Sequence, residues 1–175
     1  MKDEKKMEIV NKVAQSGIIT IDPEEFYIAG ERIIFDLKNW LFEGLILKEK
    51  DFRERIADHD WNQYANKFVA VTCTADAIVP TWAFMVVAMR LQPYAAKVIY
   101  GDLKKLEEEL FEEQVSKIRI EDFRDKRIVI KGCSGNTVPP SVYLHLTSML
   151  LPVVKSIMYG EPCSTVPIYK RREKE

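Results

Sequence analysis

The pattern of apolar and polar positions changes along the chain, and from residue 68 onward it predicts alternating strands and helices. Short apolar runs at Phe68–Thr72 and Lys97–Gly101 are typical of buried strands. The segment Pro80–Gln92 lies between them and predicts a helix, since proline is favoured in the first turn and Pro93 cannot continue the ladder. A second helix is predicted at Leu103–Lys117, where an apolar stripe runs along an acidic segment.

The same order then recurs. Arg127–Lys131 predicts a strand, Pro139–Leu151 a helix and Ser156–Gly160 a further strand. The tail Ser164–Lys170 predicts a short edge strand, because a proline such as Pro167 is unfavourable in a central one.

The amino-terminal third has a less regular pattern. It predicts helices and strands in alternation: helix Met7–Gln15, strand Gly17–Asp22, strand Glu31–Leu37, helix Lys38–Leu47 and helix Asp51–Asp58. Asp51 is the expected N-cap of the last helix, because Glu54 follows three residues later.

Residues 67–102 and 126–161 look like two copies of one unit. At constant spacing the copies match Val79/Val138, Pro80/Pro139, Leu91/Leu150, Pro93/Pro152, Tyr100/Tyr159 and Gly101/Gly160. Upstream, a slip of one residue aligns Cys73 with Cys133. Two strand–helix–strand units with buried strands favour an α/β three-layer sandwich with a mostly parallel sheet. We expect one domain over residues 1–175, with residues 1–66 packed on the repeat as an extension.

Composition limits the classes of function. The chain has 175 residues, of which 47% are hydrophobic and 30% charged, as in ordinary globular proteins. A net charge of -1 gives no general attraction to nucleic acid or anionic membranes. The charged start Met1–Lys6 does not resemble a signal peptide, and the longest apolar run, Ala83–Met89, is far too short for a membrane span. We therefore expect a cytoplasmic protein with no nucleic-acid or membrane partner.

The three cysteines are the main candidates for chemistry. In a reducing compartment they are expected to be free thiols, metal ligands or redox groups. Cys73 and Cys133 each follow a predicted strand and precede a helix, and Cys163 follows the closing strand. Because ligands bind beyond the carboxyl ends of strands in open α/β sheets, we expect all three thiols at one sheet edge.

Three thiolates suit Zn²⁺ or an iron–sulfur cluster. Asp76, in the same loop as Cys73, is the candidate fourth ligand, and His59 is another. His59 lies between two aspartates, so a surface histidine is the simpler interpretation. His145 falls inside a predicted helix and is expected to be hydrogen-bonded and partly buried rather than a ligand. Trp82 stands where the second copy has Ser141, and whether it lines a pocket or fills the core is left open.

Four segments resemble one known family: Asp36–Glu54, Val71–Ala83, Asp125–Cys133 and Val154–Arg171. The family is catalogued as domain of unknown function 2480, consists of uncharacterised bacterial proteins mainly of the Bacteroidetes lineage, and covers nearly the whole chain. Genes of its members lie beside iron–sulfur assembly genes of the SUF type. The resemblance therefore implies a metal or sulfur role with iron–sulfur assembly proteins as partners, but it carries over no activity.

Three hypotheses follow. In the first, the chain binds a metal or cluster through Cys73, Cys133 and Cys163, as an accessory factor in iron–sulfur assembly or thiol metabolism. In the second it is a non-catalytic homodimeric interaction protein with core cysteines, whose interface uses Trp82–Met89 and Val166–Lys170. The third, an enzyme with Cys73 or Cys163 as nucleophile, lacks a base at a recognisable position.

Overall fold

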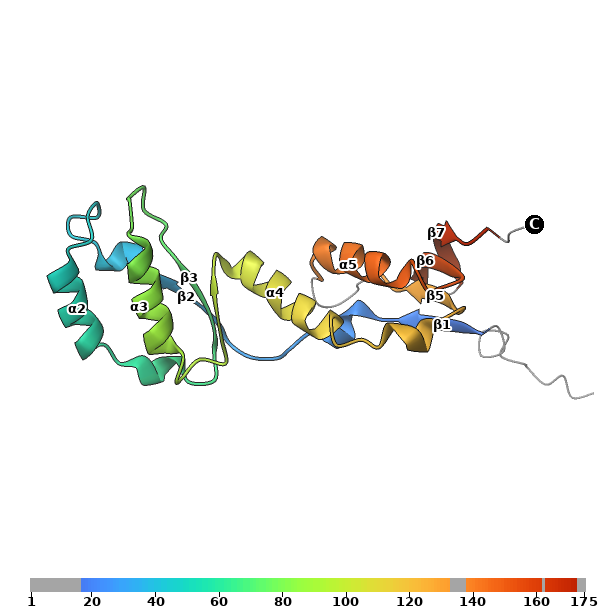
Figure 1. Cartoon of the computed structure of the whole chain (residues 1–175), viewed down its shortest axis with the longest axis horizontal. Coiled ribbons are helices and arrows are strands. Elements are labelled where there is room, and N and C mark those ends of the chain that lie inside the picture. The colour runs from blue at the N-terminus through green and yellow to red at the C-terminus, as the bar shows by residue number, and fades with distance from the viewer. Residues whose placement is uncertain (1–16, 133–137, 162, 173–175) are drawn as a thin grey trace, which may run out of the picture. The chain divides into compact units, whose positions relative to one another are not determined.

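A computed structural model describes residues 17–132, 138–161 and 163–172. The chain divides into two compact units (Figure 1). Unit 2 is the continuous segment Ile28–Leu110, and unit 1 combines Met1–Tyr27 with Phe111–Glu175. Each unit has its own sheet and is described separately.

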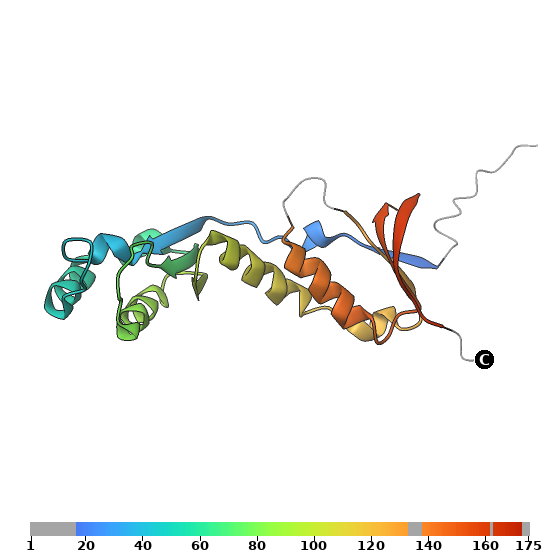
Figure 2. The same ribbon diagram turned by 90° about the horizontal axis from the view of Figure 1, so that it is seen from above.

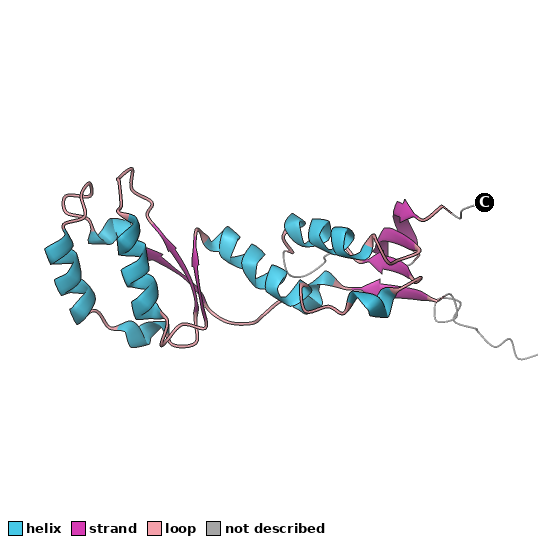
Figure 3. Cartoon of the chain, viewed as in Figure 1, coloured by secondary structure: helices cyan, strands magenta, loops and turns pink. Residues whose placement is uncertain are grey.

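Unit 2 contains the parallel sheet β2-β3-β4, formed by β2 (Arg32–Asp36), β3 (Phe68–Thr72) and β4 (Lys97–Tyr100). Helices α2 (Glu49–Asp58) and α3 (Thr81–Leu91) cover one face of the sheet (Figure 3). Val69 and Val71 of β3 belong to the core on this face. Phe68 and Ala70 point to the opposite face and pack on Leu106 and Leu110 of α4 (Leu103–Val115).

Side chains alternate along a strand, so the uninterrupted apolar run in β3 supplies both of these cores. Unit 2 is therefore a three-layer α/β/α arrangement.

Unit 1 contains the sheet β1-β5-β6-β7. Strands β1 (Ile18–Ile21), β5 (Arg127–Ile130) and β6 (Ser156–Glu161) are parallel, and β7 (Ser164–Lys170) runs antiparallel beside β6 (Figures 1 and 2). Helix α5 (Pro140–Leu150) packs on the sheet together with the last turns of α4.

The two units share one arrangement of strands and helices. This structural repeat includes more residues than the repeat that is visible in the sequence. Helix α3 corresponds to α5 and β4 to β6, each at the spacing that relates Phe68 to Arg127. Further upstream, Phe52 and Ile56 of α2 correspond to Phe111 and Val115 of α4, and all four are buried. The short turn with an N-cap aspartate after β2 corresponds to the one after β1, where Asp36 and Asp22 accept from the backbone two residues on.

The fold class is confirmed: the protein is α/β with mostly parallel strands and two similar strand–helix–strand units. The strands pair in two sheets, one for each unit, rather than in the single sheet that was predicted. Residues 28–66, expected to belong to an extension, supply β2 and α2 to unit 2. The single domain over residues 1–175 stays a prediction.

Two local predictions were wrong. The helix predicted at Lys38–Leu47 is a short 3-10 turn, Leu37–Trp40, followed by a tight turn in which Phe42 pairs with Ile46. Glu43 and Gly44 have φ values of 52° and 71°, a left-handed conformation that stops a helix. Helix α2 begins at Glu49, before Asp51, and its N-cap Lys48 makes no side-chain cap bond. The helix predicted at Met7–Gln15 lies outside the described residues.

Candidate functional site: an apolar groove between α3 and β4

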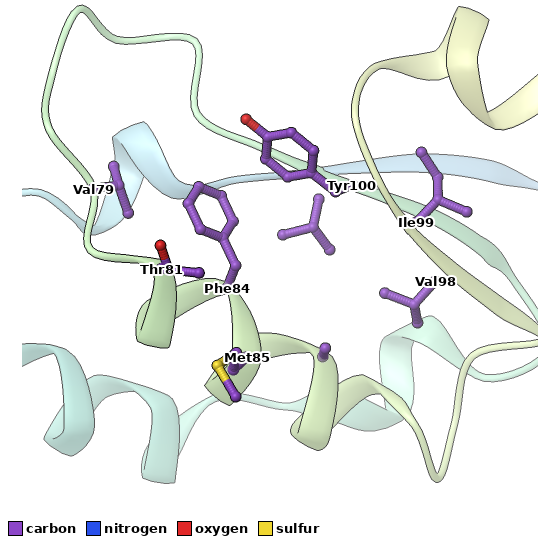
Figure 4. Close-up of a pocket in the computed structure, with 9 residues that line it drawn as sticks. Val79, Thr81, Phe84, Met85, Val98, Ile99 and Tyr100 are labelled. Atoms are coloured by element: carbon purple, nitrogen blue, oxygen red, sulfur yellow. The ribbon is translucent and has the colours of Figure 1, made fainter.

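A large apolar hollow lies in unit 2, between α3 and β4 (Figure 4). Its volume is about 560 Å³. Nine residues from β3, β4, α3 and the loop before α3 line it: Val71, Val79, Thr81, Phe84, Met85, Ala88, Val98, Ile99 and Tyr100. None of them carries a carboxylate, imidazole, amine or thiol, so the groove is suited to binding an apolar group rather than to acid–base or nucleophilic chemistry.

The groove is formed by the ordinary geometry of a strand and its crossover helix. Phe84 and Tyr100 pack against each other in its lining, with ring centroids 5.2 Å apart in an edge-to-face arrangement (Figure 4). Their solvent exposure differs: Phe84 is half-buried, whereas 73% of Tyr100 is exposed. Met85 is 67% exposed on the outer side of α3, and Met89 follows one turn later with 61% exposed. The structure thus leaves large apolar side chains in water where α3 and β4 meet.

The equivalent place in unit 1 holds a smaller hollow. There a hollow of about 120 Å³ is lined by Ile130, Tyr143, Thr147, Met158, Tyr159 and Ile168. The first five correspond, at the spacing of the repeat, to Val71, Phe84, Ala88, Ile99 and Tyr100 of the larger groove. The ring pair is repeated too, because Tyr143 and Tyr159 lie 5.8 Å apart, also edge to face. The sixth residue, Ile168, comes from β7 and has no counterpart in unit 2.

A second hollow of about 490 Å³ lies beside β2, and both polar and apolar side chains line it. His59 Nε2 is 3.1 Å from the Tyr64 hydroxyl and 3.3 Å from the Gln63 amide nitrogen. Burial lowers the pKa of His59; Asp60 opposes the shift and Arg55 adds to it. Burial also raises the pKa of Tyr64.

Asp36 shapes the other side of this second hollow. It accepts hydrogen bonds from the backbone and hydroxyl of Thr74 at 3.1 and 2.6 Å and from the Lys38 backbone at 2.9 Å. Burial by itself would raise the pKa of Asp36, but these bonds outweigh it and the pKa is lowered. Asp36 therefore ties β2 to the loop after β3, and its carboxylate oxygens are already engaged.

The predicted metal ligands divide between the two units. Cys73 is a free, half-buried thiol at the end of β3, 3.9 Å from the Ala75 carbonyl, and Asp76 is exposed in the same loop. Cys163 is free and exposed between β6 and β7, so it is not the core residue that the interaction hypothesis expects. Cys133 lies outside the described residues. Within the described ranges, no three His, Cys, Asp or Glu side chains gather in a way that could hold a metal ion.

The slip that aligned Cys73 with Cys133 is absent from the strands themselves. β3 and β5 begin at the spacing of the helices, so Gly132 corresponds to Cys73 and Cys133 comes one position later. Cys73 and Cys133 are therefore near each other in the alignment of the two copies, but they do not hold equivalent positions.

The remaining candidates take structural roles. His59 packs among aromatic rings, 4.8 Å from Trp61 and 5.1 Å from Trp40 between ring centres. His145 is half-buried, with its Nδ1 3.8 Å from Glu112. Trp82 packs edge to face on Phe52 in the core of unit 2, so it does not line the groove.

The sequence pattern indicated Trp82–Met89 as interface material, but Tyr100 and the groove were not predicted. Two features of the sequence could have indicated the groove. One is the Tyr100/Tyr159 match, and the other is that different elements follow Gly101 and Gly160. One copy goes straight into a helix there, and the other goes into a strand.

Comparison with known proteins gives a family. The family described as "Protein of unknown function (DUF2480)" matches residues 7–171, nearly the whole chain. No curated protein and no solved structure matches. None of the helices in the described part of the chain has the length and apolar character that a membrane span needs.

Proposed function

The chain belongs to the DUF2480 family, and since that description carries no activity, we propose from the structure that it is a non-catalytic binding protein whose α3–β4 groove takes an apolar segment of another protein. One observation carries the proposal: a groove of about 560 Å³ with apolar walls is open to solvent, with Met85 and Tyr100 mostly exposed. Exposed apolar patches of this kind mark interaction sites in soluble proteins, because leaving them in water costs free energy.

The test uses random peptides displayed on phage and selected against the full chain. Selected peptides are then measured by fluorescence anisotropy against the wild type, Met85→Lys and Leu144→Lys. Leu144 is the matched control, because it holds the position of Met85 in unit 1 and is 68% exposed against 67%. A charge at Met85 should weaken binding at least about tenfold, the loss expected when an apolar contact of about 1.4 kcal/mol is removed. The same charge at Leu144 should leave binding unchanged.

Two results would overturn the proposal. One is a selection that enriches no peptide, or only peptides that bind Met85→Lys as tightly as the wild type. The other is a dimer in sedimentation equilibrium that Met85→Lys dissociates, because the groove would then be an interface between copies of this chain, as the homodimer hypothesis expects.

A metal or iron–sulfur role through Cys73, Cys133, Cys163 and Asp76, in iron–sulfur assembly or thiol metabolism, is the second proposal. It is supported by two free thiols, Cys73 and Cys163, that each follow the carboxyl end of a parallel strand. Zinc and iron would be measured in protein purified without oxygen, alongside a variant with all three cysteines changed to serine. Equal, near-zero metal in both proteins would contradict this role.

A further inference from the structure

We infer that the occupant of the groove is an extended segment of a partner protein that adds to β4 as an antiparallel strand, with an aliphatic side chain in the groove and an acidic residue at its carboxyl-terminal end. The inference rests on the proposed function and specifies the partner's conformation, direction and chemistry. The chain itself provides the comparison that supports it, because unit 1 contains the same site with its occupant in place.

The edges of the two sheets differ at one position. β4 and β6 are equivalent strands, and each pairs in parallel with the central strand of its own sheet, β3 or β5. On its other side β6 pairs with β7 in antiparallel fashion, from Ser156 opposite Lys170 to Glu161 opposite Ser164. β4 ends its sheet within the described residues. The place that β7 takes in unit 1 is therefore open in unit 2.

The copies diverge just after an equivalent glycine. Gly101 directly follows β4 and Gly160 is the last residue but one of β6, with positive φ values of 142° and 119°. After Gly160 the chain turns back as β7, and a side chain at Gly160 would meet the Ser164 carbonyl oxygen at 2.6 Å. After Gly101 the chain enters α4, which covers the opposite face of the unit 2 sheet through Leu106 and Leu110. The residues that follow β4 therefore pack on a face of the sheet and do not pair with the edge of β4.

β7 narrows the groove of unit 1 with Ile168, which stays 52% exposed, and it also pairs with the edge of β6. Ile168 enters the lining beside Tyr143 and Tyr159, and Tyr169 packs on the core below. The hollow that remains is about 120 Å³, against about 560 Å³ in unit 2. An aliphatic side chain from an added strand is therefore the group that this architecture accepts at the groove.

Beyond its first residue, the edge of β4 carries no charge or proline. Edge strands in soluble proteins usually carry charges, prolines or bulges that prevent further pairing. β7, the outer strand of unit 1, has Pro167. β4 reads Lys-Val-Ile-Tyr and has a charge only at its first residue. Strand addition to such an edge combines backbone hydrogen bonds with side-chain pockets, a common mode of peptide recognition.

The charge of Lys97, the first residue of β4, adds a further requirement on the partner. In unit 1, Ser156 lies opposite Lys170 of β7, and the residue that corresponds to Ser156 in unit 2 is Lys97. A strand with the sequence of β7 would place its lysine opposite Lys97, and like charges directly opposite are unfavourable. The β7 strand of a second copy is thus a poor occupant. Lys97 already acts electrostatically on Glu109 of α4, and an acidic residue at this end of the strand would give it a second negative neighbour.

The decisive experiment uses the peptides selected against the full chain. Binding should slow amide exchange at Lys97–Tyr100 and leave Ser156–Tyr159 unchanged, as followed by NMR. A nitroxide on the carboxyl end of the peptide should broaden Lys97, and one on the amino end should broaden Tyr100. Lysine in place of the acidic residue should weaken binding roughly two- to fivefold, the range for like charges across strands. The substitution Lys97→Glu should reverse that preference.

The outcomes separate the two proposals. If peptides depend on Met85 but β4 amides stay unprotected, or the two nitroxides broaden the opposite ends, the strand inference is overturned and the groove remains a binding site. The strand inference is also overturned if Lys97→Glu does not reverse the charge preference. If no peptide depends on Met85, the proposed function fails and the inference fails with it.

Discussion

Phe52 and Phe111 hold the same position in the two units, and each is about 1% exposed. Each aromatic ring fills its own core, Phe52 beside Trp82 and Phe111 beside Val115. Such rings are tightly packed, so their removal leaves a cavity that the surrounding chain cannot fill. At the residue scale, the duplication is therefore visible as two equivalent buried phenylalanines, each of which should contribute a similar amount to the free energy of unfolding.

Phe52→Ala and Phe111→Ala should each lower the free energy of unfolding by about 3–5 kcal/mol, the range for a buried phenylalanine. Leu45→Ala is the control, because Leu45 is 63% exposed and its loss should change little. Urea denaturation followed by circular dichroism measures all three. A cost below about 1 kcal/mol for either phenylalanine would show that the ring is not part of a packed core.

His59 should make stability depend on pH. Its pKa is lowered by burial in the folded protein, so the unfolded chain binds a proton more readily. The stability that comes from the neutral imidazole is present above the unfolded pKa of about 6.5 and is lost as the pH falls through the folded pKa. Denaturation between pH 7 and pH 5.5, roughly the upper part of that window, should therefore show falling stability, and His59→Gln should flatten the change.

Carboxylates with lowered pKa values do not contribute to the change in stability over the pH range in which His59 titrates. Asp22, Asp36 and Glu109 also have lowered pKa values, held down mainly by hydrogen bonds, so their stabilisation is lost only at more acidic pH. An unchanged slope in His59→Gln would mean that another group titrates there.

At the scale of elements, strands and helices were predicted well wherever a local pattern determines them. β3 and β4 match their predicted segments to within a residue, and the proline-containing tail is the edge strand β7. The wrong helix at Lys38–Leu47 contains Glu43 and Gly44, and the left-handed conformation of two successive residues is not visible in an apolar pattern. The pairing between strands could not be predicted from the sequence either, because β1 pairs with β5 and β2 with β3 across long stretches of chain.

The two equivalent strands should exchange their amide protons at different rates. β6 is paired on both sides, by β5 and β7, whereas β4 is paired by β3 alone within the described residues. Hydrogen exchange of the free protein should therefore be faster at Lys97–Tyr100 than at Ser156–Tyr159, since unpaired edges open more easily. Equal protection would mean that a second copy already covers β4 in solution.

At the scale of the whole molecule, one copy is inserted into the other. Unit 2 is continuous from Ile28 to Leu110, and unit 1 is assembled from the segments on either side of it. Helix α4 serves both, because Leu106 and Leu110 complete one core and Phe111 and Val115 the other. The repeat therefore includes α2 and β2, although their sequences showed no clear match.

A fragment of residues 28–117 should fold by itself. It contains the whole of the β2-β3-β4 sheet, the two helices on one face and α4 on the other. Circular dichroism should show one cooperative thermal transition, and peptide binding to the groove should persist. A fragment without a cooperative transition would show that unit 2 depends on unit 1.

The sequence by itself determined the fold class, most strand and helix bounds and the existence of a repeat, because these depend on local periodicity and on prolines at helix starts. It also contained the key asymmetry, a helix after Gly101 and a strand after Gly160. Only the tertiary structure decided that the strands pair in two sheets, that Cys73 and Cys163 belong to different units, and that β7 narrows the groove of unit 1 while the equivalent groove beside β4 stays wide. The reason is physical: pairing and burial depend on contacts between distant residues, and no local pattern specifies which edge stays free.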